Sequence, residues 1–249
     1  MSNELRHTPN QQGISLDRAA YAVAGKLILS DLSFALSERR IAIIGRNGSG
    51  KTTLLRLMAG LVAPTSGSVL VDGIDPARDR KAMLDRIGIL FQNPDHQIIF
   101  PTVAEELAFG LQQQGRTKAE AASMVEDLLA RHGRSHWLTA TVHSLSQGQR
   151  HFLCLLSILA MKPDSILLDE PFASFDQPTV TRMARIFDQL QQRLIFITHD
   201  ARTASSAQRV LWLEAGQIRA DGPPARVLPE FEAEMLRLGS IDADTDIAF

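Results

Sequence analysis

Hydrophobic residues in this chain form two kinds of run that alternate along the sequence. Short runs of aliphatic and β-branched residues predict buried strands at 40–44, 87–91, 165–168 and 194–198. Apolar residues spaced three and four positions apart predict helices at 52–59, 103–132, 147–161 and 180–191. Short, fully apolar strands that alternate with helices are typical of a mostly parallel sheet covered on both faces. The pattern therefore predicts an α/β fold.

Outside this core the pattern predicts looser strands, at 14–21, 27–35, 68–72, 209–214 and 217–220. The first two are half-exposed, and Gly25 marks a turn between them. We expect an antiparallel β subdomain at the N-terminus and a helical subdomain at about 93–160, inserted between the strand-rich parts. One domain would then span 14–240, with a disordered tail at 1–13 and a frayed tail at 241–249.

Composition excludes several classes of protein. The chain has 249 residues, a net charge of −2 and a single cysteine. One cysteine excludes an internally disulfide-stapled scaffold, and near-neutral charge gives no electrostatic case for nucleic acid as a partner. The longest apolar run, 152–161, is about half of the ~20 residues that a spanning helix needs. The polar segment 1–13 lacks the apolar centre of a signal peptide, so we expect the chain to stay in the cytoplasm.

A glycine-rich segment joins the strand at 40–44 to the helix at 52–59, and it matches the pattern G-x-x-x-x-G-K-[ST]. Its backbone N–H groups and the start of the helix would cradle phosphates. Lys51 would reach the β- and γ-phosphates, and the Thr52 hydroxyl would bind Mg²⁺. The residues expected to bind ATP here are Gly45, Arg46, Asn47, Gly48, Ser49, Gly50, Lys51, Thr52 and Thr53.

Two carboxylates follow the buried strand at 165–168. Asp169 and Glu170 would lie at the carboxyl edge of the parallel sheet, where ligands of such sheets bind. We expect Asp169 to hold Mg²⁺, directly or through water, and Glu170 to act as the general base on the attacking water. The phosphate loop and the acidic pair together predict a site that hydrolyses a nucleoside triphosphate.

The helix at 147–161 opens with the residues Leu145, Ser146, Gln147, Gly148 and Gln149, ahead of the acidic strand. This segment resembles the L-S-G-G-Q signature of the ATP-binding subunits of ABC transporters. Ser146 is a good N-cap, and the N–H groups of a helix start can bind an anion. The resemblance implies that Ser146, Gln147, Gly148 and Gln149 bind the γ-phosphate held by another subunit. Gln147 departs from the family, which carries glycine there, and this puts signature affinity in question.

Other parts of the chain match the family in the same order, and the resemblance covers about 15–227. It implies that Tyr21 stacks on adenine and that Gln92 contacts Mg²⁺ or the water. It also implies that Ser174, Phe175 and Asp176 cross a dimer interface. His199, which ends the strand at 194–198, would contact the γ-phosphate. The expected fold is accordingly a P-loop NTPase core with the two subdomains described above.

The stretch 91–110 is similar to that of the energy-coupling-factor ATPases, which drive vitamin and transition-metal uptake. Biotin and cobalt or nickel importers are compatible with a chain of this length, and biotin is preferred among them. Two alternatives stay open: the ATPase of an ordinary ABC importer, and a soluble ABC ATPase of cofactor assembly.

The resemblance also implies an assembly. ATP would be sandwiched between 45–53 of one chain and 145–149 of the other in a homodimer, although a heterodimer is also compatible with the sequence. The transmembrane partners would be a coupling subunit and a substrate-binding subunit, with the ATPase bound peripherally at the cytoplasmic face of the cell membrane. Closure brings the second phosphate cradle to ATP, so ATP would favour the closed dimer.

Overall fold

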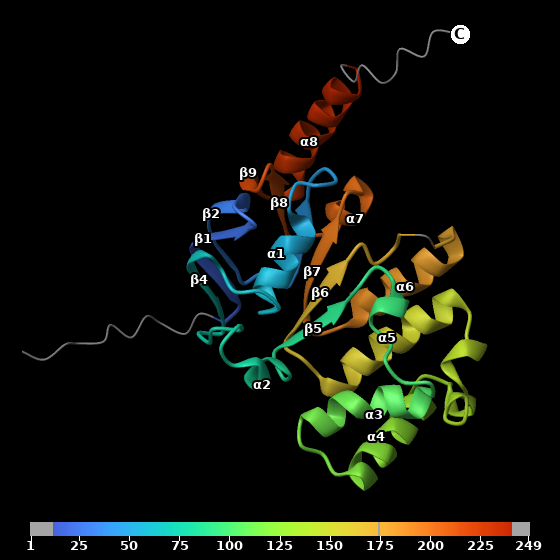
Figure 1. The fold of residues 1–249 in the computed structure, drawn as a ribbon. Coiled ribbons are helices and arrows are strands. Elements are labelled where there is room, and N and C mark those ends of the chain that lie inside the picture. Colours follow the sequence, from blue (N-terminus) through green and yellow to red (C-terminus); the bar gives the residue numbers. More distant parts are fainter. Residues whose placement is uncertain (1–11, 174, 241–249) are drawn as a thin grey trace, which may run out of the picture.

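The structure, a computed structural model, describes residues 12–173 and 175–240. Both predicted tails therefore lie outside the described residues, except for 12 and 13. The Gly13 N–H donates to Asp72 Oδ1 at 2.6 Å, so the chain is held at this point. Figure 1 shows a central sheet with a small sheet and a helix on one side and helices on the other. None of the helices in the described ranges is both long and apolar enough to cross a membrane.

The central sheet has six strands in the order β5-β6-β7-β3-β8-β9. Five of them are parallel, and β9 runs antiparallel to β8 at one edge. The strands are β3 (Arg40–Ile44), β5 (Ile87–Leu90), β6 (Ser165–Asp169), β7 (Arg193–Thr198), β8 (Arg209–Glu214) and β9 (Gln217–Gly222). The central strands are buried on both faces, which explains why their sequences are apolar without alternation. The predicted parallel sheet is confirmed.

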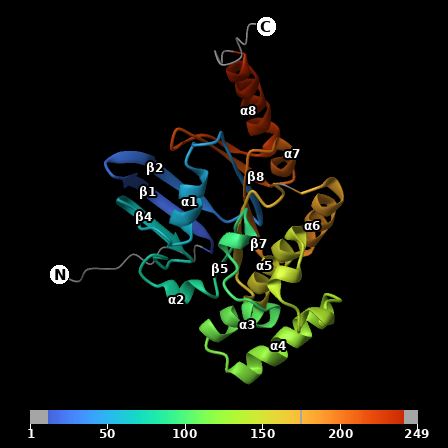
Figure 2. The same ribbon diagram turned by 45° about the vertical axis from the view of Figure 1, so that its right-hand side comes forward.

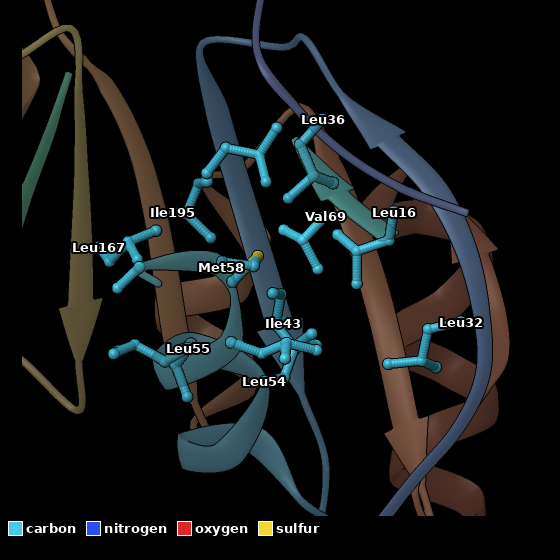
Figure 3. Close-up of a cluster of buried hydrophobic side chains, with 14 of the residues drawn as sticks. Leu16, Leu32, Leu36, Ile43, Leu54, Leu55, Met58, Val69, Leu167 and Ile195 are labelled. Atoms are coloured by element: carbon cyan, nitrogen blue, oxygen red, sulfur yellow. The ribbon is translucent and has the colours of Figure 1, made fainter. Parts of the chain in front are cut away.

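The second sheet is antiparallel, in the order β2-β1-β4, and consists of β1 (Ile14–Val23), β2 (Lys26–Leu36) and β4 (Ser66–Val71). Helix α1 (Lys51–Met58) lies between the two sheets. Figure 3 shows Leu54, Leu55 and Met58 of α1 among side chains of both sheets, such as Ile43 and Leu16. These contacts form one core, and they fix the start of α1 relative to both sheets.

The opposite face of the central sheet is covered by helices α5 (Gln147–Met161), α6 (Gln177–Gln189), α7 (Ala201–Ser205) and α8 (Pro224–Gly239). Figure 2 shows α8 projecting away from the body of the molecule. Helices α7, α8 and the short helix α2 (Arg80–Met83) were not predicted from the sequence. Helix α8 begins at Pro224 and contains Pro229. Because proline breaks helices in most contexts, these residues made the segment look non-helical in the sequence.

The helical subdomain consists of α3 (Val103–Gln113), α4 (Lys118–Arg131) and one face of α5, which supplies Leu153, Leu156 and Ala160 to its core. The predicted helical stretch 103–132 is therefore two helices. They are separated by Gly115, which has φ +88°, and by Thr117, which forms a capping box with Glu120. Helix α5 has the predicted bounds and belongs to two cores, because Leu153 faces the subdomain while Cys154 faces the sheet. Cys154 is buried, and this burial raises the pKa of its thiol to about 12.

Candidate nucleotide-binding site

The phosphate loop occupies the turn between β3 and α1, as predicted. Two of its glycines are required by close approach of other parts of the chain. A Cβ at Gly45 would overlap the carbonyl oxygen of Leu213 in β8. At Gly50, where φ is +104°, a Cβ would lie 2.8 Å from Leu29 Cδ2. Residues of both sheets therefore pack closely against the loop and restrict its conformation.

Lys51 lies over the loop rather than out in solvent. Its Nζ donates to the carbonyl oxygens of Gly45 at 2.7 Å and Arg46 at 3.0 Å, and the residue is 8% exposed. Burial lowers the pKa of Lys51, while the carboxylates of Glu170 and Asp169 raise it. The Ser49 hydroxyl is buried with no hydrogen-bond partner among the described residues. The loop thus holds the Lys51 ammonium group and the unpartnered Ser49 hydroxyl, and an anion bound in the loop could accept hydrogen bonds from both.

The acidic pair lies at the same edge of the central sheet as the phosphate loop. The Thr52 hydroxyl donates to Asp169 Oδ2 at 3.4 Å, which joins the start of α1 to the end of β6. Burial, and then the neighbouring Glu170, raise the pKa of Asp169, and the Thr52 hydrogen bond and Lys51 oppose this. A cation at this point would relieve the repulsion between the two carboxylates.

Glu170 is held on both of its carboxylate oxygens. His199 Nδ1 lies 2.8 Å from Oε1, and the Thr198 hydroxyl lies 3.3 Å from Oε2 and donates to it. The backbone of Glu170 has φ +47°, and its N–H donates to the carbonyl of Ile197 at 2.8 Å. A positive φ at a non-glycine residue is costly and gathers at functional positions. Glu170 and His199 directly follow two neighbouring parallel strands, β6 and β7, and the structure brings their side chains into contact.

Gln92 lies at this edge too, after the neighbouring strand β5. Leu90 of β5 pairs with Leu168 of β6. Gln92 and Glu170 each lie two residues after these paired residues, so they occupy equivalent positions after neighbouring strands. The Gln92 side chain is exposed and makes no hydrogen bond to other described residues. Tyr21 is half-buried on β1 and pairs with Leu29, whose Cδ2 would lie 2.8 Å from a Cβ at Gly50. Tyr21 is thus one strand removed from the phosphate loop.

The predicted signature forms the N-terminus of α5 through a capping box. The Gln149 N–H donates to Ser146 Oγ at 3.3 Å, and the Ser146 N–H donates to Gln149 Oε1 at 2.8 Å. Gln147 is the first helical residue, so its Cβ is accommodated by a regular helix. A Cβ at Gly148 would meet only Thr179 Cγ2, at 4.0 Å. No hydrogen bond or ion pair joins the signature to the phosphate loop within the described part of this chain.

Of the segment predicted to cross a dimer interface, Ser174 lies outside the described residues. Asp176 is the N-cap of α6 and accepts the N–H of Thr179 at 3.1 Å. Phe175 packs edge-on against His151 of α5, with ring centroids 4.9 Å apart. The segment that follows Glu170 therefore touches the helix that carries the signature.

Comparison with known proteins decides the family. The sequence model of the family described as ABC transporter matches residues 29–173, which is more than half of the chain. The chain belongs to the ABC transporter family. A relative from Rhodobacter capsulatus, named Biotin transport ATP-binding protein BioM, is 49% identical over 93% of this chain and 99% of its own length. A protein of the same name from Rhizobium etli is 38% identical over 88% and 97%.

Other members of the ABC transporter family agree with this placement. The energy-coupling factor transporter ATP-binding protein EcfA1 of Mycoplasma mobile is 36% identical over 90% of this chain and 83% of its own length. A solved structure of cbiO1 from Clostridium perfringens, described as part of the ABC transporter complex cbiONQ, has a TM-score of 0.75 at 28% identity. That similarity covers 93% of this chain and 97% of the solved one.

Sequence reasoning missed several residues of this ABC ATPase that surround the predicted ones. Arg150 and His151 directly follow the signature, yet their partners lie on other loops. Glu106 is 7% exposed and accepts the N–H groups of Ile99 and Phe100 at 2.9 and 3.0 Å. Glu106 could have been found from the sequence, because it is a glutamate among apolar residues in the first turn of a predicted helix.

Proposed function

We propose that this ABC ATPase is the ATP-hydrolysing subunit of an energy-coupling-factor importer that takes up biotin. The observation that carries the proposal is the 49% identity to a biotin transport ATP-binding protein over nearly the full length of both chains. The stretch 91–110, which was predicted to be of the energy-coupling-factor type, supports the same class.

The phosphates of ATP would be bound by the N–H groups of 45–52 and by Lys51. The donor set Thr52, Asp169 and Gln92 consists of oxygen ligands, which suit Mg²⁺. Among the described residues no cluster of three or more His, Cys, Asp or Glu side chains could hold a metal ion. This fits Mg²⁺, which commonly uses one or two carboxylates together with substrate phosphates. When bound, Mg²⁺ would neutralise charge that develops on the transferred phosphoryl group.

Glu170 would accept the proton of the attacking water. Its two oxygens already receive hydrogen bonds from Thr198 and, with the proton on Nδ1, from His199. These donors hold the carboxylate in one orientation, so that a remaining lone pair can face the water. His199 would then position the Glu170 carboxylate. The imidazole ring of His199 is exposed and would also contact the γ-phosphate. Tyr21 would stack on adenine at the side of the loop.

The signature would complete the site from a second copy of the chain. In one copy the N–H groups of Gln147 and Gly148 belong to the first helical turn and have no intrahelical acceptor. Gly148 has open space beside it, which leaves room for a phosphate supplied by a partner. A homodimer could therefore form complete sites, and a heterodimer with a related subunit would use the same contacts.

A surface on the helical subdomain would receive the transmembrane coupling subunit. Ile99 is 70% exposed and Phe109 is 36% exposed, and the rings of Phe100 and Phe109 lie 5.1 Å apart. A hollow of about 430 Å³ beside them is lined by Phe100, Glu105, Phe109, Gln112, Arg116 and Lys118. An exposed apolar patch with a polar rim is typical of an interaction surface. Through it the ATPase would be held at the cytoplasmic face of the membrane, together with a substrate-binding membrane subunit.

The proposal is tested by uptake of radiolabelled biotin in cells that lack their own biotin transporter. The chain is co-expressed with a transmembrane coupling subunit and a substrate-binding subunit from the same source, and Glu170→Gln is the matched control. We expect uptake with the wild-type chain and none with Glu170→Gln. Uptake of Co²⁺ or Ni²⁺ but not biotin would overturn the substrate, and recovery of the chain only in the soluble fraction would overturn the importer.

A further inference from the structure

The segment that follows Gln92 is a folded unit rather than a loose loop. Asn93 Oδ1 accepts the N–H of Asp95 at 2.9 Å, which caps the short helix η1 (Pro94–His96). Gln97 Oε1 accepts the N–H of Phe91 at 3.2 Å and closes the segment on its own start. At its far end the buried Glu106 carboxylate accepts the two N–H groups of Ile99 and Phe100. The segment 91–100 is thus bonded internally and fixed to α3.

An ion pair joins this unit to the helix that carries the signature. Arg150 Nε lies 3.4 Å from Asp95 Oδ1. The Arg150 side chain is 25% exposed, and its Nε is fully buried with no hydrogen bond in the described part of the chain. A buried guanidinium nitrogen is costly unless a charge compensates it. Among the described residues, Asp95, whose side chain is 62% exposed, is the acidic group within 4.0 Å of Arg150. Arg150 directly follows Gln149, the last residue of the signature.

The pair connects two places that serve different nucleotides under the proposed function. Gln92 follows β5 at the same edge of the central sheet as the acidic pair and would contact the ATP bound by its own chain. Ser146 and Gly148 would contact the ATP bound by the partner. A rigid unit that starts at Gln92 and ends on the first turn of α5 therefore carries a displacement at one nucleotide to the other.

We propose that Asp95 and Arg150 are positioning residues that couple the two nucleotide sites of the dimer. The inference rests on the proposed function, because it requires that ATP is sandwiched between two copies. The pair acts through the placement of Ser146 and Gly148 and touches neither ATP nor water. Its loss should therefore reduce cooperativity and turnover, while the affinity of a single phosphate loop for ATP stays unchanged.

The test compares Asp95→Asn, Arg150→Gln and the charge-reversed double variant Asp95→Arg with Arg150→Asp. The rate of ATP hydrolysis by the purified chain is measured against ATP concentration, and nucleotide affinity is measured by equilibrium binding of a fluorescent ATP analogue to the dilute monomer. Coupling between sites typically changes affinity about 5- to 150-fold. We expect each single variant to lower the Hill coefficient toward 1 and kcat about tenfold, with monomer affinity within about twofold of wild type.

Two controls separate coupling from a structural effect. Arg131→Gln removes an exposed arginine of α4 on the same subdomain and should leave the Hill coefficient unchanged. The charge-reversed double variant restores the ion pair and should regain most of the lost cooperativity, which general loosening of the subdomain would not allow. Thermal unfolding checks that each variant is folded.

Three results would overturn the inference: a wild-type chain that hydrolyses ATP without cooperativity, single variants with a wild-type Hill coefficient, or no recovery in the double variant. Failure of the proposed function would look different. A wild-type chain that hydrolyses ATP cooperatively, with the expected behaviour of the variants but no biotin uptake, would leave the coupling intact and remove only the importer assignment.

Discussion

The phosphate loop and the signature both lie at the start of a helix, α1 in the core and α5 in the helical subdomain, yet their glycines are held differently. A Cβ at Gly45 would collide with the backbone of β8, whereas a Cβ at Gly148 would find open space. Lys51 and Thr52 already have partners within the chain. The phosphate loop is thus fixed by contacts within the chain, whereas no contact among the described residues requires glycine at 148. Under the proposed function, that requirement comes from the phosphate of a partner protomer.

The largest effect should come from the half of the site that holds the phosphate loop. Glu170→Gln removes the proposed general base but keeps the shape of the side chain, so turnover should fall roughly 100- to 10,000-fold. ATP binding should persist because the phosphate loop is untouched. Single-turnover hydrolysis and equilibrium ATP binding measure the two quantities. A variant with near-normal turnover would contradict the role of Glu170.

Two matched glycine substitutions test the comparison directly. Gly45→Ala should destabilise the fold by about 3 kcal/mol, because the new methyl group overlaps a backbone carbonyl that cannot move aside. Gly148→Ala should preserve or raise stability by up to about 1 kcal/mol, since alanine favours a helix. The same variant should lower ATPase activity at least about tenfold, because the methyl group occupies the space left for the partner's phosphate.

Denaturant unfolding and ATPase rates of both glycine variants check this expectation. If Gly148→Ala lost as much free energy of unfolding as Gly45→Ala, the inference that Gly148 has open space beside it would be wrong. If it were fully active, the signature would not contact a phosphate from the partner.

The same contrast explains how much the sequence could predict. The phosphate loop and the bounds of α5 follow from local signals, a glycine pattern after a strand and the Ser146 capping box. The contact of Glu170 with His199 follows from the rule that parallel strands end at one edge. By contrast, the pair Asp95 and Arg150 joins residues 55 positions apart, and only the packed fold brings them together. Helix α8 was missed because Pro229 contradicts the helical spacing around it.

The junction between the two regions should carry a distinct pH dependence. His151 is 2% exposed beside Phe175, and burial lowers its pKa to about 4. Between about pH 6.5 and 4 the unfolded chain takes up a proton at this residue and the folded chain does not. The free energy of unfolding therefore has its full value above pH 6.5 and falls as pH decreases, by up to about 3 kcal/mol from this residue.

Urea unfolding from pH 7 to pH 4.5 measures this loss in the wild-type chain and in His151→Gln. The variant lacks the titrating group, so its stability should fall less steeply over the same interval, whatever its stability at pH 7. Equal slopes would mean that His151 is already protonated, or accessible to solvent, in the folded chain.

The smallest effect is expected at Gln147, where the signature departs from its family. The residue begins α5 with regular helical backbone, so neither its side chain nor a glycine is demanded by the fold. Gln147→Gly should cost less than about 1 kcal/mol of stability, because glycine weakens the first turn. It should change the ATPase rate by less than about threefold, since the N–H that faces the partner is the same in both residues. A rate increase of tenfold or more would show instead that the glutamine side chain obstructs the partner's phosphate, and the signature would then be limited from within its own chain.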